Sequence, residues 1–125
     1  GADNDARMLN FGEEGSMAIE PGFLMVEPGD IVTFLPTNSD HWIKDLIQPE
    51  GTKFLACKLD ETYTMTLAEK GLHVDSCPSH LMMSMAGVIQ LGFELDQIRE
   101  ELPGHTRRMF QNRGRLDTYL GQVEE

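Results

Sequence analysis

The chain has 125 residues, 40% of them hydrophobic, and its 21 acidic and 10 basic side chains give a formal net charge of −11. This length and composition predict one domain, spanning residues 1–125, with enough apolar material for a core, and they argue against an intrinsically disordered chain. The acidic balance argues against nucleic acid as a partner, because binding to phosphates requires clustered lysines and arginines.

The N-terminal part of the chain alternates short apolar runs with turn residues. Residues 7–11 are predicted to open the sheet, and a second strand is predicted at residues 23–26. Pro28-Gly29 then separates that strand from a β-branched run at residues 31–35. A Pro-Gly pair between two such runs predicts a turn that joins two strands.

Three further strands are predicted before the chain changes character. Residues 62–67 alternate strictly, with an aromatic or aliphatic side chain at every second position and a threonine between, which is the period of a half-buried strand. Residues 71–76 and 86–91 are also predicted as strands. Six or more short strands at this spacing indicate a β-sandwich or barrel over about residues 7–92.

After Gly92 the spacing of the apolar residues becomes helical. A first helix is predicted from about residue 94 and is broken by Pro103-Gly104, and a second apolar stripe runs from Met109 to Val123 with an interruption at Gly114. The sequence therefore predicts a mainly β domain followed by two C-terminal α-helices that end near residue 123.

The segment with the clearest chemistry lies between the last two predicted strands. Cys77, His80 and Met85 bring a thiol, an imidazole and a thioether into one loop, and a second imidazole, His41, follows the strand at residues 31–35. A thiolate with two imidazoles and a weak axial thioether selects copper and suits both of its oxidation states. The two-residue gap between Cys77 and His80 lets one tight loop present both side chains to one ion.

Each of these side chains also has an ordinary structural explanation, since lone cysteines and methionines often fill apolar cores. A copper site that suits both oxidation states can carry single electrons, and two functional alternatives to such an electron carrier stay open. One is a Cu(I) carrier or store that uses Met82, Met83 and Met85, because soft thioethers favour Cu(I). The other is an enzyme with Cys77 as nucleophile and His80 as base, which is weaker because no oxyanion-stabilising or orienting group is evident. No enzymatic activity is expected.

The pattern Cys-x-x-His-x-x-x-x-Met before a last strand, with one histidine upstream, resembles the blue-copper cupredoxin family, and within it the pseudoazurins. The similarity runs from about residue 7 to residue 123 and includes Met8-Leu9-Asn10, Gly15-Ser16-Met17, Glu20-Pro21 and residues 28–34, 44–47 and 49–51. It implies a Greek-key β-sandwich that binds one copper per chain and transfers single electrons. It also implies four ligands, the rings of His41 and His80, the Cys77 thiolate and the long axial Met85 sulfur.

The resemblance also implies supporting roles for three residues. Met17 is expected near the exposed ligand His80, and Asn10 is expected to hydrogen-bond near the loop that follows His41. Met83 has the wrong spacing for the axial ligand and is expected to pack beneath the loop.

The sequence departs from the pseudoazurin pattern beside two of these ligands. Trp42 follows His41, where the family usually has an asparagine whose side chain connects two loops. This side-chain connection is therefore expected to be lost. The Trp42 backbone N–H can still donate to the Cys77 sulfur. Pro78 follows Cys77 directly, one position earlier than in the family. Ser79 therefore keeps its N–H, and we expect it to donate a further hydrogen bond to the thiolate and to shift the reduction potential.

Other residues with reactive side chains are expected to be structural. Cys57 is expected to be a structural thiol on or beside a strand, His73 a residue on the sheet surface, and His105 a capping or solvent-exposed residue. Four arginines are expected to form a solvated helix face: Arg107, Arg108, Arg113 and Arg115.

Charge and resemblance together predict the partners and the location. Pseudoazurins present lysines to acidic copper reductases, but this chain has four lysines among 21 acidic residues, so a basic redox partner such as a c-type cytochrome is predicted. The longest apolar runs fall far short of the roughly 18 residues that a membrane span requires, so no span is expected. The resemblance implies a periplasmic location.

Overall fold

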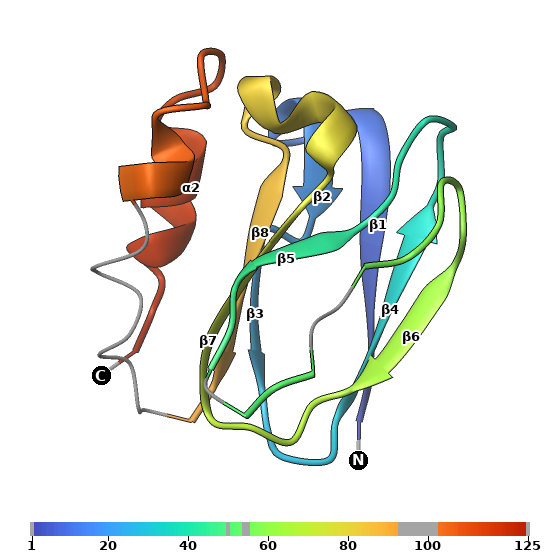
Figure 1. Ribbon diagram of the computed structural model, residues 1–125, viewed down its shortest axis with the longest axis vertical. Helices are drawn as coiled ribbons and strands as arrows, with labels where there is room; N and C mark the ends of the chain where they lie inside the picture. Colours follow the sequence, from blue (N-terminus) through green and yellow to red (C-terminus); the bar gives the residue numbers. More distant parts are fainter. Residues whose placement is uncertain (1, 50, 54–55, 93–102, 125) are drawn as a thin grey trace.

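Two four-stranded β-sheets face each other and enclose the core (Figure 1). The computed structural model describes residues 2–49, 51–53, 56–92 and 103–124. The first sheet has the strand order β2-β1-β4-β6 and the second has the order β3-β8-β7-β5. The strands span the following residues: β1 Asp3–Gly12, β2 Gly15–Glu20, β3 Phe23–Val26, β4 Ile31–Pro36, β5 Lys44–Ile47, β6 Tyr63–Thr66, β7 Gly71–Ser76 and β8 Ala86–Leu91.

Side-chain alternation decides which face of the first sheet is buried. Ala6 and Met8 of β1 and Val32 and Phe34 of β4 are buried, whereas the residues between them are more exposed. β1 and β4 run parallel, with Ala6 opposite Phe34, so these apolar side chains share one face. This face forms the core together with side chains of the second sheet.

The second sheet is buried on both faces. Every residue of β7 and β8 is buried, because one face joins the core and the C-terminal helix α2 (Arg115–Leu120) covers the other. Figure 1 shows α2 lying beside β8. His73 shares a face with Ile89, which belongs to the core between the sheets. The predicted position of His73 on the sheet surface is therefore wrong.

Most of the predicted strands are confirmed. The bounds of β7 and β8 agree with the prediction at both ends, β3, β4 and β6 agree closely, and β1 is longer than predicted. β2 and β5 are absent from the prediction. β2 carries Met17 in a left-handed conformation (φ 46°), and β5 has only four residues and begins with Lys44 and Asp45, so neither strand shows a clear period of two. The Pro28-Gly29 turn joins strands of different sheets.

The C-terminal segment is helical in two places within the described residues. Residues 103–106 are helical, and the Pro103 carbonyl accepts the Arg107 N–H, so Pro103 and Gly104 belong to a helical turn. The rest of the first predicted helix lies outside the described residues. The second helix is shorter than its apolar stripe, because α2 begins only after Gly114. The predicted fold class, a mainly β sandwich with C-terminal helices, is confirmed. In the described parts of the chain, no helix is long and apolar enough to cross a membrane.

Asp75 is an unexpected side chain in the interior. It is buried on β7 opposite Asp45 of β5, and its Oδ1 has no hydrogen-bond partner among the described residues. Burial, and then the charge of Asp45, raises the pKa of Asp75 well above its usual value. Because folding raises this pKa, the stability that the carboxyl contributes is present below the pKa of the unfolded chain and is lost as the pH rises through the folded pKa.

We expect Asp75→Asn to increase the free energy of unfolding of the metal-free chain at about pH 8, by on the order of 1–3 kcal/mol, because the carboxyl ionises freely in the unfolded chain but burial disfavours its ionisation in the folded chain, whereas an amide has no such difference. The gain should shrink towards about pH 4, as the carboxyl becomes protonated in the unfolded chain as well. Urea denaturation followed by circular dichroism measures both values. Asp5→Asn, at an exposed position of β1, is the control, and a gain that does not depend on pH would contradict the expectation.

Candidate metal centre

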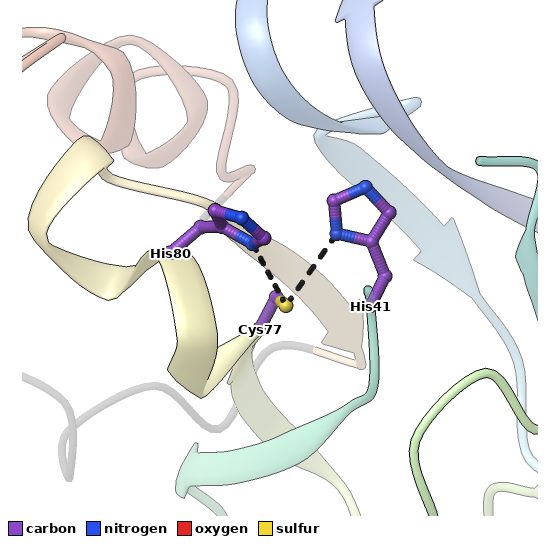
Figure 2. Close-up of side chains that lie close together, drawn as sticks. All are labelled: His41, Cys77 and His80. Carbon is purple, nitrogen blue, oxygen red and sulfur yellow. Dashed lines mark hydrogen bonds between the residues drawn. The ribbon is translucent and has the colours of Figure 1, made fainter. Parts of the chain in front are cut away.

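Three side chains converge at one end of the sandwich, as Figure 2 shows. Cys77 follows β7, His80 lies in the 3-10 helix η1 (Pro78–Met83), and His41 precedes β5. The Cys77 Sγ lies 3.7 Å from His41 Nδ1 and 3.5 Å from His80 Nδ1. All three atoms lie within 4.8 Å of one another. The structure thus brings the distant histidine to the two loop residues, as the sequence predicts.

Backbone hydrogen bonds shape the loop from Cys77 to Met85. Pro78 begins η1, the His80 N–H donates to the Cys77 carbonyl (3.0 Å), and the Cys77 N–H donates to the Met85 carbonyl (2.9 Å). Ser84 adopts a left-handed conformation (φ 62°) and turns the chain towards β8. Met85 therefore returns beside Cys77, and its side chain is buried in the same core cluster.

The His41 ring is oriented by two neighbours. Its Nε2 lies 2.7 Å from Asn10 Oδ1. Because this oxygen can only accept, Nε2 carries the proton and the Nδ1 lone pair is left for a metal. The His41 N–H donates to Asp60 Oδ1 (3.1 Å), and the Asp60 N–H donates to the His41 carbonyl (2.7 Å). Burial, and then the nearby His80, lowers the pKa of His41, which keeps the ring neutral and available to a cation.

The contact with His41 specifies the role predicted for Asn10. Asn10 was expected to hydrogen-bond near the loop after His41, and the structure specifies its partners: the side chain binds the His41 ring and the backbone N–H donates to Asn38 Oδ1 (2.8 Å). β1 runs beside β4, and the chain leaves β4 towards His41, so this pairing brings Asn10 to the ring. Asp60 is absent from the prediction because nothing in the sequence distinguishes it from the other acidic residues.

The Cys77 sulfur is buried and lies close to several backbone N–H groups. Burial raises the pKa of Cys77, and the N–H groups of Trp42, Ser79 and His80 lower it to a smaller extent. The N–H groups predicted to act on the sulfur, those of Trp42 and Ser79, are thus among the groups that lower this pKa. A buried thiol with a raised pKa is a poor nucleophile, but a metal cation can displace its proton. This environment favours a metal ligand over a catalytic nucleophile.

A side-chain hydrogen bond ties the two histidine-bearing segments together. The Trp42 Nε1–H donates to Ser79 Oγ over 3.1 Å. Trp42 follows His41 and Ser79 precedes His80, so the bond joins the immediate neighbours of both rings. The expected loss of a side-chain tie at Trp42 is therefore wrong, because the indole N–H reaches the Ser79 hydroxyl.

The other candidate thiol and imidazole lie outside this group. Cys57 is a free, buried thiol whose Sγ accepts the Ile43 N–H (3.1 Å), which agrees with its predicted structural role. His73 Nε2 lies 3.2 Å from the Glu69 carbonyl oxygen. The structure groups neither side chain with Cys77 as a metal ligand.

The predicted solvated helix face of four arginines is not formed, because the three exposed arginines lie in turns and the one on a helix is buried. Arg107, Arg108 and Arg113 are exposed, and an Arg108 nitrogen lies 2.8 Å from Nδ1 of the half-buried His105. Arg115 is only 8% exposed and bonds to backbone carbonyls near the metal centre. No periodicity could reveal this role, because these carbonyls belong to loops far away in the sequence.

The separations around Cys77 fit one shared cation. Metal–sulfur and metal–nitrogen bonds of about 2.3 and 2.0 Å at trigonal angles place the sulfur roughly 3.7 Å from each nitrogen. The observed separations are 3.7 and 3.5 Å. A trigonal thiolate and two imidazoles, with a thioether close by, are the donors that select copper. His41 and Cys77 are buried and His80 is half-exposed, so the His80 edge connects the site to the surface.

Comparison with known proteins finds pseudoazurins, although no family model matches the chain. The pseudoazurin of Paracoccus pantotrophus is 37% identical over 125 residues, which cover 98% of this chain and 84% of that protein. A putative pseudoazurin of Rhizobium leguminosarum bv. viciae is 37% identical over 129 residues, which cover 98% and 80%.

Solved structures of pseudoazurins have the same fold as this chain. A pseudoazurin from Sinorhizobium gives a TM-score of 0.86 at 27% identity and covers 100% of this chain and 98% of its own. The pseudoazurin of Hyphomicrobium denitrificans gives 0.81 at 26% identity, with coverage of 99% and 100%.

We expect Asn10→Ala to weaken metal binding by about 10–100-fold, because the variant removes the acceptor that fixes the His41 ring. Titration of the metal-free chain with Cu(II) or Co(II) measures the affinity. Asn10→Asp retains an acceptor and should bind at least as tightly as the wild type. Equal affinities for the Ala and Asp variants would show that the contact does not orient the ring.

Proposed function

Because the chain belongs to the pseudoazurin family of blue-copper cupredoxins, we propose that His41, Cys77, His80 and Met85 hold its copper ion. The protein is a type 1 copper electron-transfer protein with one copper per chain. Copper supplies the Cu(II)/Cu(I) couple. The observation that carries the ligand assignment is the Cys77 sulfur, which lies 3.7 and 3.5 Å from the two Nδ1 atoms.

Met85 is the proposed axial ligand. Its N–H donates to the His80 carbonyl (3.3 Å), its carbonyl accepts the Cys77 N–H, and its side chain is buried in the cluster that contains Cys77. Met82 is 57% exposed and Met83 is half-buried. These differences support Met85 over Met83, and they argue against a Cu(I) store that uses all three thioethers.

The polypeptide's contribution is to hold its donor atoms nearly still while the charge at the centre changes. Asn10 fixes the His41 ring, Asp60 fixes its backbone, and the Trp42–Ser79 bond joins the two histidine-bearing segments. Donors that are already oriented need little rearrangement when one electron arrives or leaves, which favours fast transfer.

The half-exposed His80 ring is the proposed route for electrons. On the same loop Met82 is 57% exposed, and the 66% exposed Phe110 donates its N–H to the Met82 carbonyl (2.7 Å). An apolar surface of this kind suits brief docking of a redox protein. The net charge of −11 supports a basic partner, such as a c-type cytochrome, over an acidic copper reductase. A periplasmic location is proposed from the family alone.

The proposed function is tested by adding Cu(II) to the metal-free chain. We expect an intense visible absorption at one copper per chain, a paramagnetic-resonance spectrum typical of type 1 copper, and a reversible voltammetric wave. Cys77→Ser should remove the absorption while circular dichroism still shows the β fold. Binding of Cu(I) alone, without a reversible wave, would instead indicate a copper store.

The axial assignment is tested in the same experiment by Met85→Gln. A harder oxygen donor stabilises Cu(II), so the reduction potential should fall. Met83→Leu is the matched control on the same loop and should leave the potential unchanged. If the Met83 variant shifted the potential and the Met85 variant did not, the axial role would belong to Met83.

We further expect Ser79→Pro to lower the reduction potential. The Ser79 N–H lowers the pKa of Cys77 and so stabilises negative charge on the sulfur. More charge remains on sulfur in the reduced centre, so loss of this donor favours the oxidised form. Ser79→Ala keeps the N–H but loses the hydroxyl that Trp42 binds, and thereby separates the two effects. Voltammetry with equal potentials for the Pro and Ala variants would rule out a contribution from the N–H.

A further inference from the structure

Arg115, the first residue of α2, is a buried cation that binds two separate segments. Its Nη1 donates to the carbonyls of Met17 (2.7 Å), Ser84 (3.3 Å) and Met83 (3.5 Å), and its Nη2 donates to those of Ser16 (2.7 Å) and Glu14 (3.0 Å). All five acceptors are backbone oxygens. The planar guanidinium with its fixed fork of donors is suited to such an array, whereas an ammonium group is not.

The two segments lie next to each other, close to the metal centre. Ser84 directly precedes Met85, the proposed axial ligand, and the Ser84 N–H closes the loop on Leu81 (2.8 Å). Met17 begins the part of β2 that packs against the core cluster containing Cys77 and Met85. Arg115 therefore connects the loop that carries the ligands to the start of β2.

Both segments have a strained backbone at the point that Arg115 binds. Met17 (φ 46°) and Ser84 (φ 62°) adopt left-handed conformations, although neither is a glycine. Such residues cost on the order of 1–3 kcal/mol each and persist only where their surroundings fix them. The Arg115 guanidinium binds the carbonyl of each, so it stabilises two conformations that the local sequence disfavours.

The turn between β1 and β2 is built closely around the guanidinium. Gly15 has φ 109°, and a Cβ atom at this position would lie 3.1 Å from Arg115 Nη2. A side chain at residue 15 would therefore be strained and would crowd Arg115. The glycine and the arginine fit each other across about 100 residues of sequence.

The residues before Arg115 attach to the same loop. Asn112 Nδ2 donates to the Met83 carbonyl (3.1 Å), and the Ser84 hydroxyl donates to the Gln111 carbonyl (2.7 Å). The Phe110 N–H donates to the Met82 carbonyl (2.7 Å). The C-terminal segment thus lies along the metal loop as well as covering the second sheet.

We propose that Arg115 is a positioning residue of the copper centre. Arg115 holds the Met83–Ser84 turn and thereby fixes the position of Met85. The C-terminal helix, which does not contact the metal, would in this way determine how closely the Met85 sulfur approaches it. The inference rests on the function proposed above, in which Met85 is the axial ligand.

The first test uses the metal-free chain and needs no copper. In Arg115→Met, amide hydrogen exchange at Ser84, Met85 and Cys77 should become roughly tenfold faster or more, because hydrogen bonds from a charged donor to the turn are lost. Arg115→Lys keeps the charge but not the fork, and should give an intermediate rate. Tyr119→Phe is the matched control, because Tyr119 lies on the same helix and donates to Glu14 Oε2 (2.5 Å), away from the metal loop.

The second test uses the copper-loaded chain. Arg115→Met should change the reduction potential and the paramagnetic-resonance parameters, and this change should be smaller when Met85 is already replaced by Gln, because Arg115 acts through Met85. Tyr119→Phe should change neither quantity. If Arg115→Met does not fold, Asn112→Gly removes the neighbouring bond to Met83 without strain, since Asn112 has φ 55°, and it should show the same effects at smaller size.

The outcomes separate the two proposals. A wild-type chain without a type 1 copper spectrum would overturn the proposed function. If the wild-type chain shows that spectrum but Arg115→Met accelerates amide exchange no more than Tyr119→Phe does, the role proposed for Arg115 is overturned. Equal acceleration at Ser84 and throughout β8 would also overturn it, because it would show that Arg115 stabilises the fold in general.

Discussion

A thiol and two imidazoles share a very small volume at the end of an apolar sandwich, and the rest of the site is organised by this constraint. Their ligand atoms lie within 4.8 Å of one another, and His41 and Cys77 are fully buried. Burial favours the neutral imidazole and thiol, and a metal cation can bind the imidazole and displace the thiol proton. A ligand side chain also needs a hydrogen-bond partner that fixes its direction, and His41 receives such partners from a distant strand and loop, Asn10 and Asp60.

The C-terminal segment serves the fold and the site together. Leu116 and Tyr119 of α2 cover the outer face of the second sheet, which explains why β7 and β8 are buried throughout. Arg115 of the same helix reaches the turns beside the ligands. A helix that only covered the sheet would not need a buried cation on its first turn.

The sequence predicted local features better than long-range ones. The strands β7 and β8 and the loop between them follow from alternation, turn residues and close ligand spacing, which are all local. His41 could be proposed as the second imidazole from its place after a strand, but its position as a ligand beside Cys77 was implied only by the family resemblance. Arg115 looked like a surface residue because its partners are backbone carbonyls, which leave no trace in side-chain patterns. β2 was missed because Met17, at its centre, has an unusual backbone conformation.

The contact between Trp42 and Ser79 also gives the molecule an optical property. Trp42 is the only tryptophan of the chain. Its indole binds Ser79, next to His80, and its backbone directly follows His41. The Trp42 backbone N–H also lowers the pKa of Cys77. Once copper is bound to Cys77, we expect an indole held beside the centre to lose excitation energy to the coloured copper–thiolate group. The fluorescence of this single tryptophan is then expected to differ between the oxidised and the reduced protein, without an attached label.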